Sequence, residues 1–181
     1  AVLADKDKVE MEDQIREKVG NSGRTRIICR TGSPTSMMDL DIVNVNASKS
    51  IIVVCDEKDS SATALKTILA IVNRPNRRTE PYHIVVNLHK LGDLEVAKII
   101  GKEEVELIHV SSLVARIEAQ SCRQSGLALV YEELLDFQGD EIYFCLEQEV
   151  VGKTYGDAVL SYENSAVMGI FSNGIVQINP A

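Results

Sequence analysis

The stretch "SIIVVCDEKDSSATALKTILAIV", residues 50–72, places an apolar strand directly before an amphipathic helix. Residues 50–55 form the kind of apolar run that is typical of a parallel strand covered on both faces. A helix is predicted next, because Asp59, Ser60 and Ser61 are capping residues. The apolar residues of that helix recur at intervals of three and four: Ala62, Leu65, Leu69 and Val72.

The same order of strand and helix recurs on both sides of this stretch. Upstream, the pattern predicts a strand end at 2–4, a helix reaching residue 19, a strand at 25–29 and a short helix at 35–40. Downstream, it predicts a strand at 83–88, a helix at 92–100 and a strand at 105–110. Such alternation indicates an α/β fold with a Rossmann-like, doubly wound parallel sheet and right-handed crossovers over residues 1–110. Its first strand is predicted to be missing, because residue 1 already lies inside an apolar run.

The order changes after residue 110. Ser111 and Ser112 are expected to cap a helix that reaches about Cys122, and a second helix follows the break at residues 124–126. This helix–turn–helix, residues 111–138, carries an apolar stripe that needs a partner, either the sheet or a second subunit. The interface residues predicted from this region are Leu113, Ile117, Leu127, Val130, Leu134 and Phe137.

Residues 139–181 are expected to form the start of a small α+β lobe. Short segments that alternate in polarity predict strands at 141–147, 166–171 and 175–178, with glycines between them.

Composition excludes several classes of function. The 181 residues carry a formal net charge of −8, which argues against nucleic-acid binding, because phosphate contacts need a basic surface. The four cysteines form no C-x-x-C pair, and the three histidines do not fall at metal-ligand spacing. No apolar run reaches the roughly 20 residues of a membrane span. No catalytic motif is present, so no catalytic residue is predicted, and no metal ligand can be named.

Ligands of open α/β sheets bind beyond the carboxyl ends of the strands. Asp5 follows the strand end at 2–4, where an acid in a dinucleotide fold accepts hydrogen bonds from a ribose diol. The alternative is that Asp5 or Asp7 caps its own helix. Asp56, at the end of the strand in 50–55, is a further candidate.

The segment "CRTGSPT", residues 29–35, forms an elbow between the predicted strand and helix. Its candidate ligand-binding residues are Arg30, Thr31, Gly32 and Ser33. Gly32 lets backbone N–H groups approach an anion closely, and Arg30 could pair with phosphate. The alternative is an ordinary helix start with Pro34 at the first helical position. The arginines of the loop at 74–81 could also bind an anion, although a solvated loop is the favoured interpretation.

Three stretches carry a family resemblance: "VLADKDKVEMEDQIREKV" (2–19), "TRIICRTGSPTSMMDLDIVNVNASKSIIVV" (25–54) and "HIVVNLHKLGDLEVAKIIG" (83–101). They resemble the cytosolic gating domain of Castor/Pollux-type ion channels, in a bacterial homologue. That domain is a variant of the RCK (regulator of conductance of potassium) module. Ser33 stands where related Trk-type domains have an acid in the turn.

The resemblance implies a cytoplasmic domain of a membrane protein that senses a ligand, calcium or a nucleotide, and gates a potassium- or calcium-type cation channel. Its partners would be further copies, in a dimer or a gating ring, and the pore domain of the same polypeptide. It implies no nucleic-acid partner and no direct membrane contact by these residues. Two alternatives stay open: a fragment of a Rossmann-class NAD(P)-dependent oxidoreductase, and a soluble nucleotide-sensing subunit of a potassium transporter.

Overall fold

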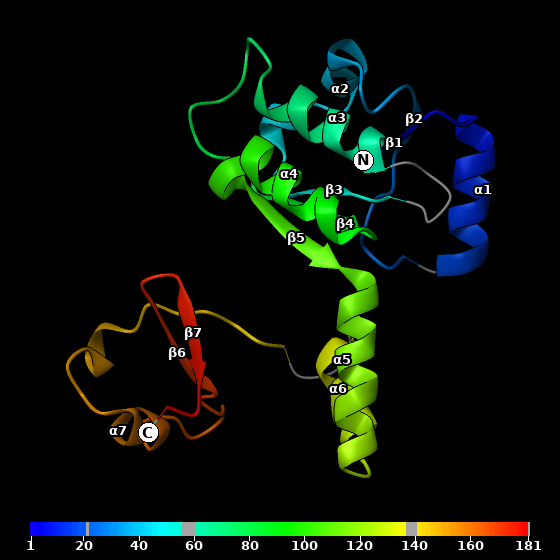
Figure 1. Cartoon of the computed structure of the whole chain (residues 1–181). Helices are drawn as coiled ribbons and strands as arrows, with labels where there is room; N and C mark the ends of the chain where they lie inside the picture. The colour runs from blue at the N-terminus through cyan, green and yellow to red at the C-terminus, as the bar shows by residue number, and fades with distance from the viewer. Residues whose placement is uncertain (21, 56–60, 137–140, 181) are drawn as a thin grey trace. The chain divides into compact units, whose positions relative to one another are not determined.

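The computed structural model describes residues 1–20, 22–55, 61–136 and 141–180 (Figure 1). The candidate residues Asp56 and Phe137, and the predicted caps Asp59 and Ser60, lie outside the described residues. The chain divides into two compact units, residues 1–123 and 124–181.

All strands of the first unit pair in parallel. β1 (Val2–Ala4) pairs with β2 (Cys29–Thr31), and β3 (Ile51–Val53), β4 (Ile84–Leu88) and β5 (Val105–His109) form a second sheet in that order. The helices between them are α1 (Lys8–Val19), α2 (Met37–Ile42), α3 (Ser61–Val72) and α4 (Leu91–Gly101), and α5 (Val110–Arg123) follows β5. The predicted Rossmann-like α/β fold is confirmed.

The two parallel sheets are not joined by a backbone ladder within the described residues. In a dinucleotide-type sheet of strand order 3-2-1-4-5-6, the first strand lies between the second and the fourth. If β1 is the second strand, β3 is the fourth, and the break lies where the first strand would pair.

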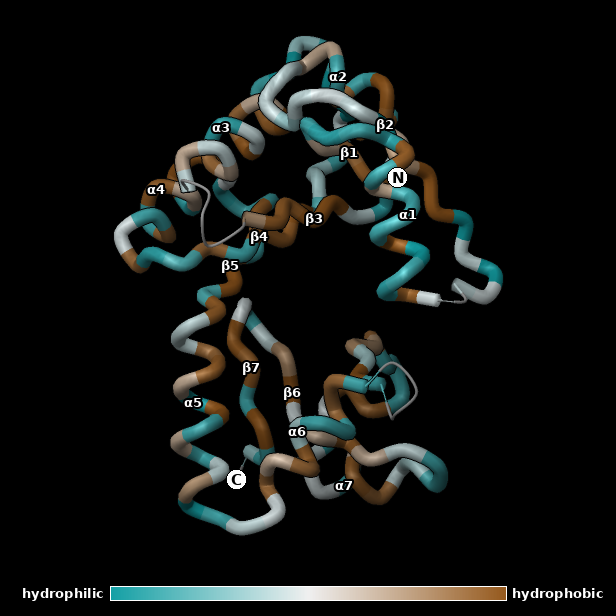
Figure 2. The backbone as a smooth tube through the Cα atoms, turned by 90° about the vertical axis from the view of Figure 1, so that its right-hand side faces the viewer, coloured by the Kyte–Doolittle hydropathy of each residue, from teal (hydrophilic) through white to brown (hydrophobic). Residues whose placement is uncertain are grey.

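The core of the first unit lies between the larger sheet and the helices α3 and α4. β4 alternates between fully buried and half-buried positions, and Ile84, Val86 and Leu88 have no exposed surface. They pack in one cluster with Ile68 and Ile71 of α3, and Figure 2 shows this apolar character along β3 and β4. The helix predicted after the strand in residues 50–55 is confirmed as α3.

The other face of the same sheet is more open. Ile52 and its near neighbour Val54 are 72% and 76% exposed, although the sequence predicted a strand covered on both faces. Among the described residues, the helices that pack most closely on this sheet, α3 and α4, cover only the face that carries Val53 and Val86. The β3 part of the second face is therefore largely exposed.

Two predicted boundaries are wrong. The strand predicted at 25–29 begins only at Cys29, because the register is set by pairing with β1, in which Ala4 lies opposite Thr31. Pro34 is not the first residue of the short helix, since Ser36 caps α2 by accepting a hydrogen bond from the Asp39 N–H.

The second unit contains short elements. α6 (Leu127–Leu135) is followed by a 3-10 turn (Gln148–Val150), α7 (Tyr155–Val159) and an antiparallel hairpin of β6 (Gly169–Ser172) and β7 (Ile175–Ile178). Residues 141–147 form no strand, although their alternation predicted one. An alternating segment becomes a strand only when a partner accepts its hydrogen bonds, and these residues have no ladder partner in the described part of the chain.

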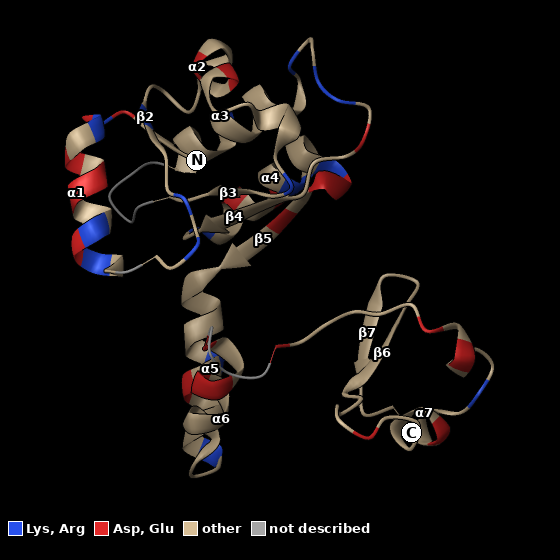
Figure 3. Ribbon diagram, turned by 180° about the vertical axis from the view of Figure 1, so that it is seen from behind, with Lys and Arg blue, Asp and Glu red and all other residues tan. Residues whose placement is uncertain are grey.

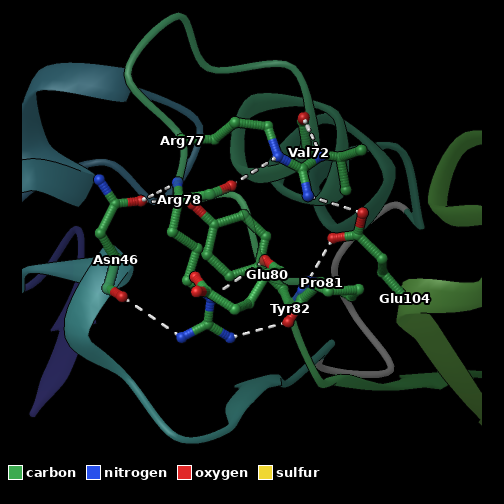
Figure 4. A network of polar contacts seen from close by, with 8 residues as sticks. All are labelled: Asn46, Val72, Arg77, Arg78, Glu80, Pro81, Tyr82 and Glu104. Atoms are coloured by element: carbon green, nitrogen blue, oxygen red, sulfur yellow. Dashed lines mark hydrogen bonds and ion pairs between the residues drawn. The ribbon is translucent and has the colours of Figure 1, made fainter.

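The arginine-rich loop before β4 is a structural clasp and not the solvated loop that was favoured from the sequence (Figure 4). Arg78 donates to the carbonyl oxygens of Ser48 at 2.7 Å and Pro81 at 3.0 Å. Arg77 and Arg78 lie over the ring of Tyr82, with 5.2 Å and 4.7 Å between guanidinium carbon and ring centroid. Both cations are therefore held by backbone carbonyls and an aromatic face.

Glu104 closes the clasp from the turn before β5. Its carboxylate accepts from Arg77 Nη2 at 2.7 Å and from the Tyr82 backbone N–H at 2.9 Å. Burial by itself raises the pKa of Glu104, but the Arg77 and Tyr82 hydrogen bonds and the charges of Arg77 and Arg78 outweigh it, so the pKa lies below its ordinary value. The side chain is 17% exposed, so solvent screens this pair only in part.

A carboxyl group with a lowered pKa in the folded state stabilises the fold above its unfolded pKa, and loses that effect as the pH falls through the folded value. We expect Glu104→Gln to lower the free energy of unfolding at pH 7 and to flatten its dependence on pH below about 4.5. Urea unfolding between pH 3 and pH 7 measures both effects. Glu103→Gln is the control. The Glu103 carboxylate is next in the chain to Glu104 but makes no hydrogen bond to Arg77 or Tyr82 among the described contacts. Equal pH profiles for wild type and Glu104→Gln would contradict this account.

Candidate functional site at the carboxyl ends of the strands

The carboxyl ends of β1 and β2 meet at the elbow. The Gly32 N–H donates to the Ala4 carbonyl at 3.0 Å, which continues the β1–β2 ladder by one step. The Thr31 hydroxyl donates to the Lys6 carbonyl at 2.8 Å. These two bonds hold the segment that contains Asp5 beside Gly32. The structure therefore brings Asp5, Thr31 and Gly32 together, as the order of the strands predicts.

Asp7, and not Asp5, caps α1. The Asp7 carboxylate accepts from the N–H groups of Val9 at 2.8 Å and Glu10 at 3.1 Å. One of the two alternatives for Asp5 is thereby removed, because the helix end is already satisfied by its neighbour. Asp5 itself is exposed at the end of β1.

The backbone donors of the elbow are occupied by the protein itself. The Ser33 N–H donates to Asp39 Oδ2 at 2.9 Å, and the Ser33 hydroxyl lies 2.9 Å from that of Thr35. Arg30 turns back along the chain, where Nη1 donates to the Cys29 carbonyl at 2.9 Å. A phosphate at this elbow would have to displace the Asp39 carboxylate. The arrangement as it stands favours hydroxyl groups or a cation over an anion.

There is little space for a side chain at Gly32. A Cβ atom at this position would lie 3.0 Å from Asp39 Cβ and 3.1 Å from Leu3 Cδ1. The absence of a side chain therefore lets α2 deliver Asp39 to the backbone of residue 33. Asp39 was not among the predicted site residues, and its only sequence signal is its place in the first turn of α2.

A second polar cluster lies at the carboxyl ends of β3, β4 and β5. The Asn87 amide accepts from the Cys55 N–H at 2.7 Å and donates to the Cys55 carbonyl at 3.2 Å. His89 Nε2 donates to the same carbonyl at 3.1 Å, and His109 Nε2 donates to the His89 carbonyl at 3.0 Å. These side chains continue the ladder beyond the last backbone pairs.

Neither cluster is a metal centre in the part of the chain that the structure describes, where no three His, Cys, Asp or Glu side chains gather as ligands. Charged residues of both signs are spread along α1 and do not form a single patch (Figure 3). In the described ranges, no helix combines the length and the apolar composition that spanning a membrane requires.

The fold and the position of the two clusters define a Rossmann-like α/β domain with its candidate site at the carboxyl edge of the sheet. Residues 111–181 match the family model described as "Castor and Pollux, part of voltage-gated ion channel". The matched part of the chain is therefore similar to the Castor and Pollux family.

Curated relatives extend this match over nearly the whole chain. "Probable ion channel CASTOR" of Oryza sativa subsp. japonica is 33% identical over 172 residues, which are 93% of this chain and 19% of the relative. "Ion channel CASTOR" of Lotus japonicus is 31% identical, over 94% of this chain and 20% of the relative. "Probable ion channel POLLUX" of Arabidopsis thaliana is 30% identical, over 99% and 22%. The chain thus spans about a fifth of the length of these relatives, all of which are named as ion channels and not as enzymes.

The Asp39 carboxylate is expected to hold the elbow through its bond to Ser33. Asp39→Ala leaves a partly buried N–H without its acceptor and should lower the free energy of unfolding by about 1–3 kcal/mol. Asp39→Asn keeps an oxygen acceptor at the same place and should cost clearly less. Urea unfolding of the two variants beside wild type gives the comparison. If the two substitutions cost the same, the bond to Ser33 is not what Asp39 contributes.

Proposed function

We propose that the chain is part of the ligand-sensing, gating region of a cation channel of the potassium or calcium type. The observation that carries this proposal is the similarity of nearly the whole chain to relatives named as ion channels. The relatives are several times longer than this chain, and in this proposal the pore belongs to segments outside these 181 residues. In this proposal the described units lie on the cytoplasmic side and perform no chemistry on a substrate.

The sensing site of the proposal is the carboxyl edge around Asp5, with Arg30, Thr31, Gly32 and Ser33 as its further residues. Two features support Asp5 as the central group: it follows β1 and is free of the capping role that Asp7 takes. With Asp39 bonded to the Ser33 N–H, the elbow offers carboxylate and hydroxyl oxygens. These groups suit the ribose hydroxyls of a nucleotide or a calcium ion.

The coupling element of the proposal is the pair α5 and α6. No residue of either helix is buried, although both carry large apolar side chains, among them Leu113 at 48% and Val130 at 51% exposure. Such helices gain stability by packing against a partner. We assign that role to a second copy of the chain, with Leu113, Ile117, Leu127, Val130 and Leu134 at the contact.

Ligand binding would then act by population shift. A ligand that binds one arrangement of the assembled copies better than another favours the first by the difference in binding free energy, and by no more. The pore responds only to that difference. The proposal therefore needs two measurable properties, a ligand and self-association.

The ligand is tested by thermal unfolding of the wild-type chain with calcium chloride or with NAD, ATP and ADP in turn. A ligand that binds only the folded state raises the melting temperature, and at a hundredfold excess over its dissociation constant it adds about 2.7 kcal/mol of stability. We expect one of these ligands to raise the melting temperature, and Asp5→Asn to abolish the rise. Asp13→Asn, on the exposed side of α1, is the matched control and should leave it unchanged. No rise with any of them would contradict ligand sensing by these residues.

Self-association is tested at α6. Val130→Asp places a charge on the predicted contact and should convert dimers or larger assemblies to monomers in analytical ultracentrifugation. Ala128→Asp adds the same charge to another side of the exposed helix and should leave the mass unchanged. A wild-type chain that stays monomeric at high concentration, or two variants that behave alike, would refute this interface.

A further inference from the structure

The start of α5 is held by a histidine. α5 begins at Val110, directly after the last residue of β5, and its first-turn N–H groups have no partner within the helix. The Ser112 N–H donates to Nδ1 of His109 at 3.1 Å. The imidazole thus takes the place of an N-cap side chain, and the predicted capping by Ser111 and Ser112 is wrong. Figure 1 shows α5 leaving the sheet at this point.

The two bonds of the ring define its protonation state. His109 Nε2 lies 3.0 Å from the His89 carbonyl oxygen, which can only accept, so Nε2 carries a proton. The Ser112 backbone N–H can only donate, so Nδ1 carries none. The geometry therefore requires the neutral ring with its proton on Nε2. A protonated imidazolium has no lone pair for Ser112.

Protonation of His109 would weaken the start of α5 in two ways. The Ser112 N–H would lose its acceptor, and a positive charge would stand at the helix N-terminus, where the backbone dipole also places its positive end. Both effects have the same sign. The Nε2–H bond to His89 would persist, so the ring would stay attached to the residue that follows β4 while it released α5.

No charged side chain of the described elements around His109 offsets these effects through a hydrogen bond or an ion pair to the ring. Glu106 lies on β5, the strand of His109, but its carboxylate contacts a different histidine. The Glu106 carboxylate lies 3.2 Å from Nε2 of His83. His89 uses its ring nitrogen Nε2 on the Cys55 carbonyl. The other ionisable residues of the elements packed on β5 are Lys90, Asp93, Glu95 and Lys98 before and along α4, and Arg116, Glu118, Cys122 and Arg123 along α5.

We propose that His109 is a proton-operated latch between the carboxyl edge of the sheet and the first turn of α5. The neutral ring fastens Ser112 to the edge formed by Cys55, Asn87 and His89, and the protonated ring releases it. This inference concerns the attachment of α5 alone and stands whether or not the chain senses a ligand. Histidine is suited to the role because imidazole titrates near neutral pH.

The latch is tested by amide hydrogen exchange and ring titration, both followed by NMR on the 181-residue chain. With exchange rates corrected for the intrinsic effect of pH, we expect protection of the Ser112 N–H to be lower at pH 5.5 than at pH 7.5. The fall is at most about tenfold per pH unit, because release of α5 is coupled to the uptake of one proton. His109→Asn supplies an oxygen acceptor that does not titrate, so it should keep protection at both pH 7.5 and pH 5.5. His109→Ala should show low protection at both.

Two controls separate His109 from the other histidines. His83→Asn and His89→Asn should retain the pH response of Ser112, because neither ring contacts that N–H. The proposal is overturned if Ser112 protection in wild type does not change while the His109 ring titrates, if His109→Asn shows the same pH response as wild type, or if replacement of His83 or His89 removes that response.

Discussion

Burial of β4 is the constraint on which the first unit depends. Ile84, Val86 and Leu88 have no exposed surface, and they can reach that state only with α3 packed over them and with β3 and β5 paired on either side. Because strand side chains alternate and parallel strands share their direction, this one arrangement also determines what lies at the two ends of the sheet. Tyr82 lies in the arginine clasp at the amino end of β4. Asn87 and His89 lie at its carboxyl end.

The sequence predicts the long elements well and short ones less well. The α3 helix and β4 carry strong periodic or continuous apolar patterns, and both lie where those patterns place them. The predicted start of β2 was wrong because the apolar residues before Cys29 have the pattern of a strand by themselves. The observed register is set by pairing with β1, some 27 residues away in the chain. Residues 141–147 show the converse case, in which a suitable pattern has no ladder partner among the described residues. Pairing is a property of two segments, so one segment cannot reveal it.

The candidate site shows the same limit. The order of strands and helices was sufficient to place Asp5 and Gly32 at one edge, since carboxyl ends of parallel strands coincide. It could not show that Asp39 reaches back to the Ser33 N–H, because that contact depends on the direction in which the short α2 leaves the elbow. The order of elements also could not show that the arginines before β4 bind backbone carbonyls. Nor could it show that His109, and not Ser111 or Ser112, caps α5. Each of these polar contacts depends on distances that only the assembled sheet defines.

The clasp around Tyr82 also gives the chain an internal optical probe. The sequence contains no tryptophan and five tyrosines, and of these five Tyr82 alone is buried, at 2% exposure. Its ring lies close to two guanidinium groups, in a rigid and asymmetric electric field. Near-ultraviolet circular dichroism arises from aromatic rings in such fixed environments and fades when they become mobile. The aromatic spectrum of this chain therefore reports chiefly on one corner of the sheet, while the far-ultraviolet spectrum reports on its helices.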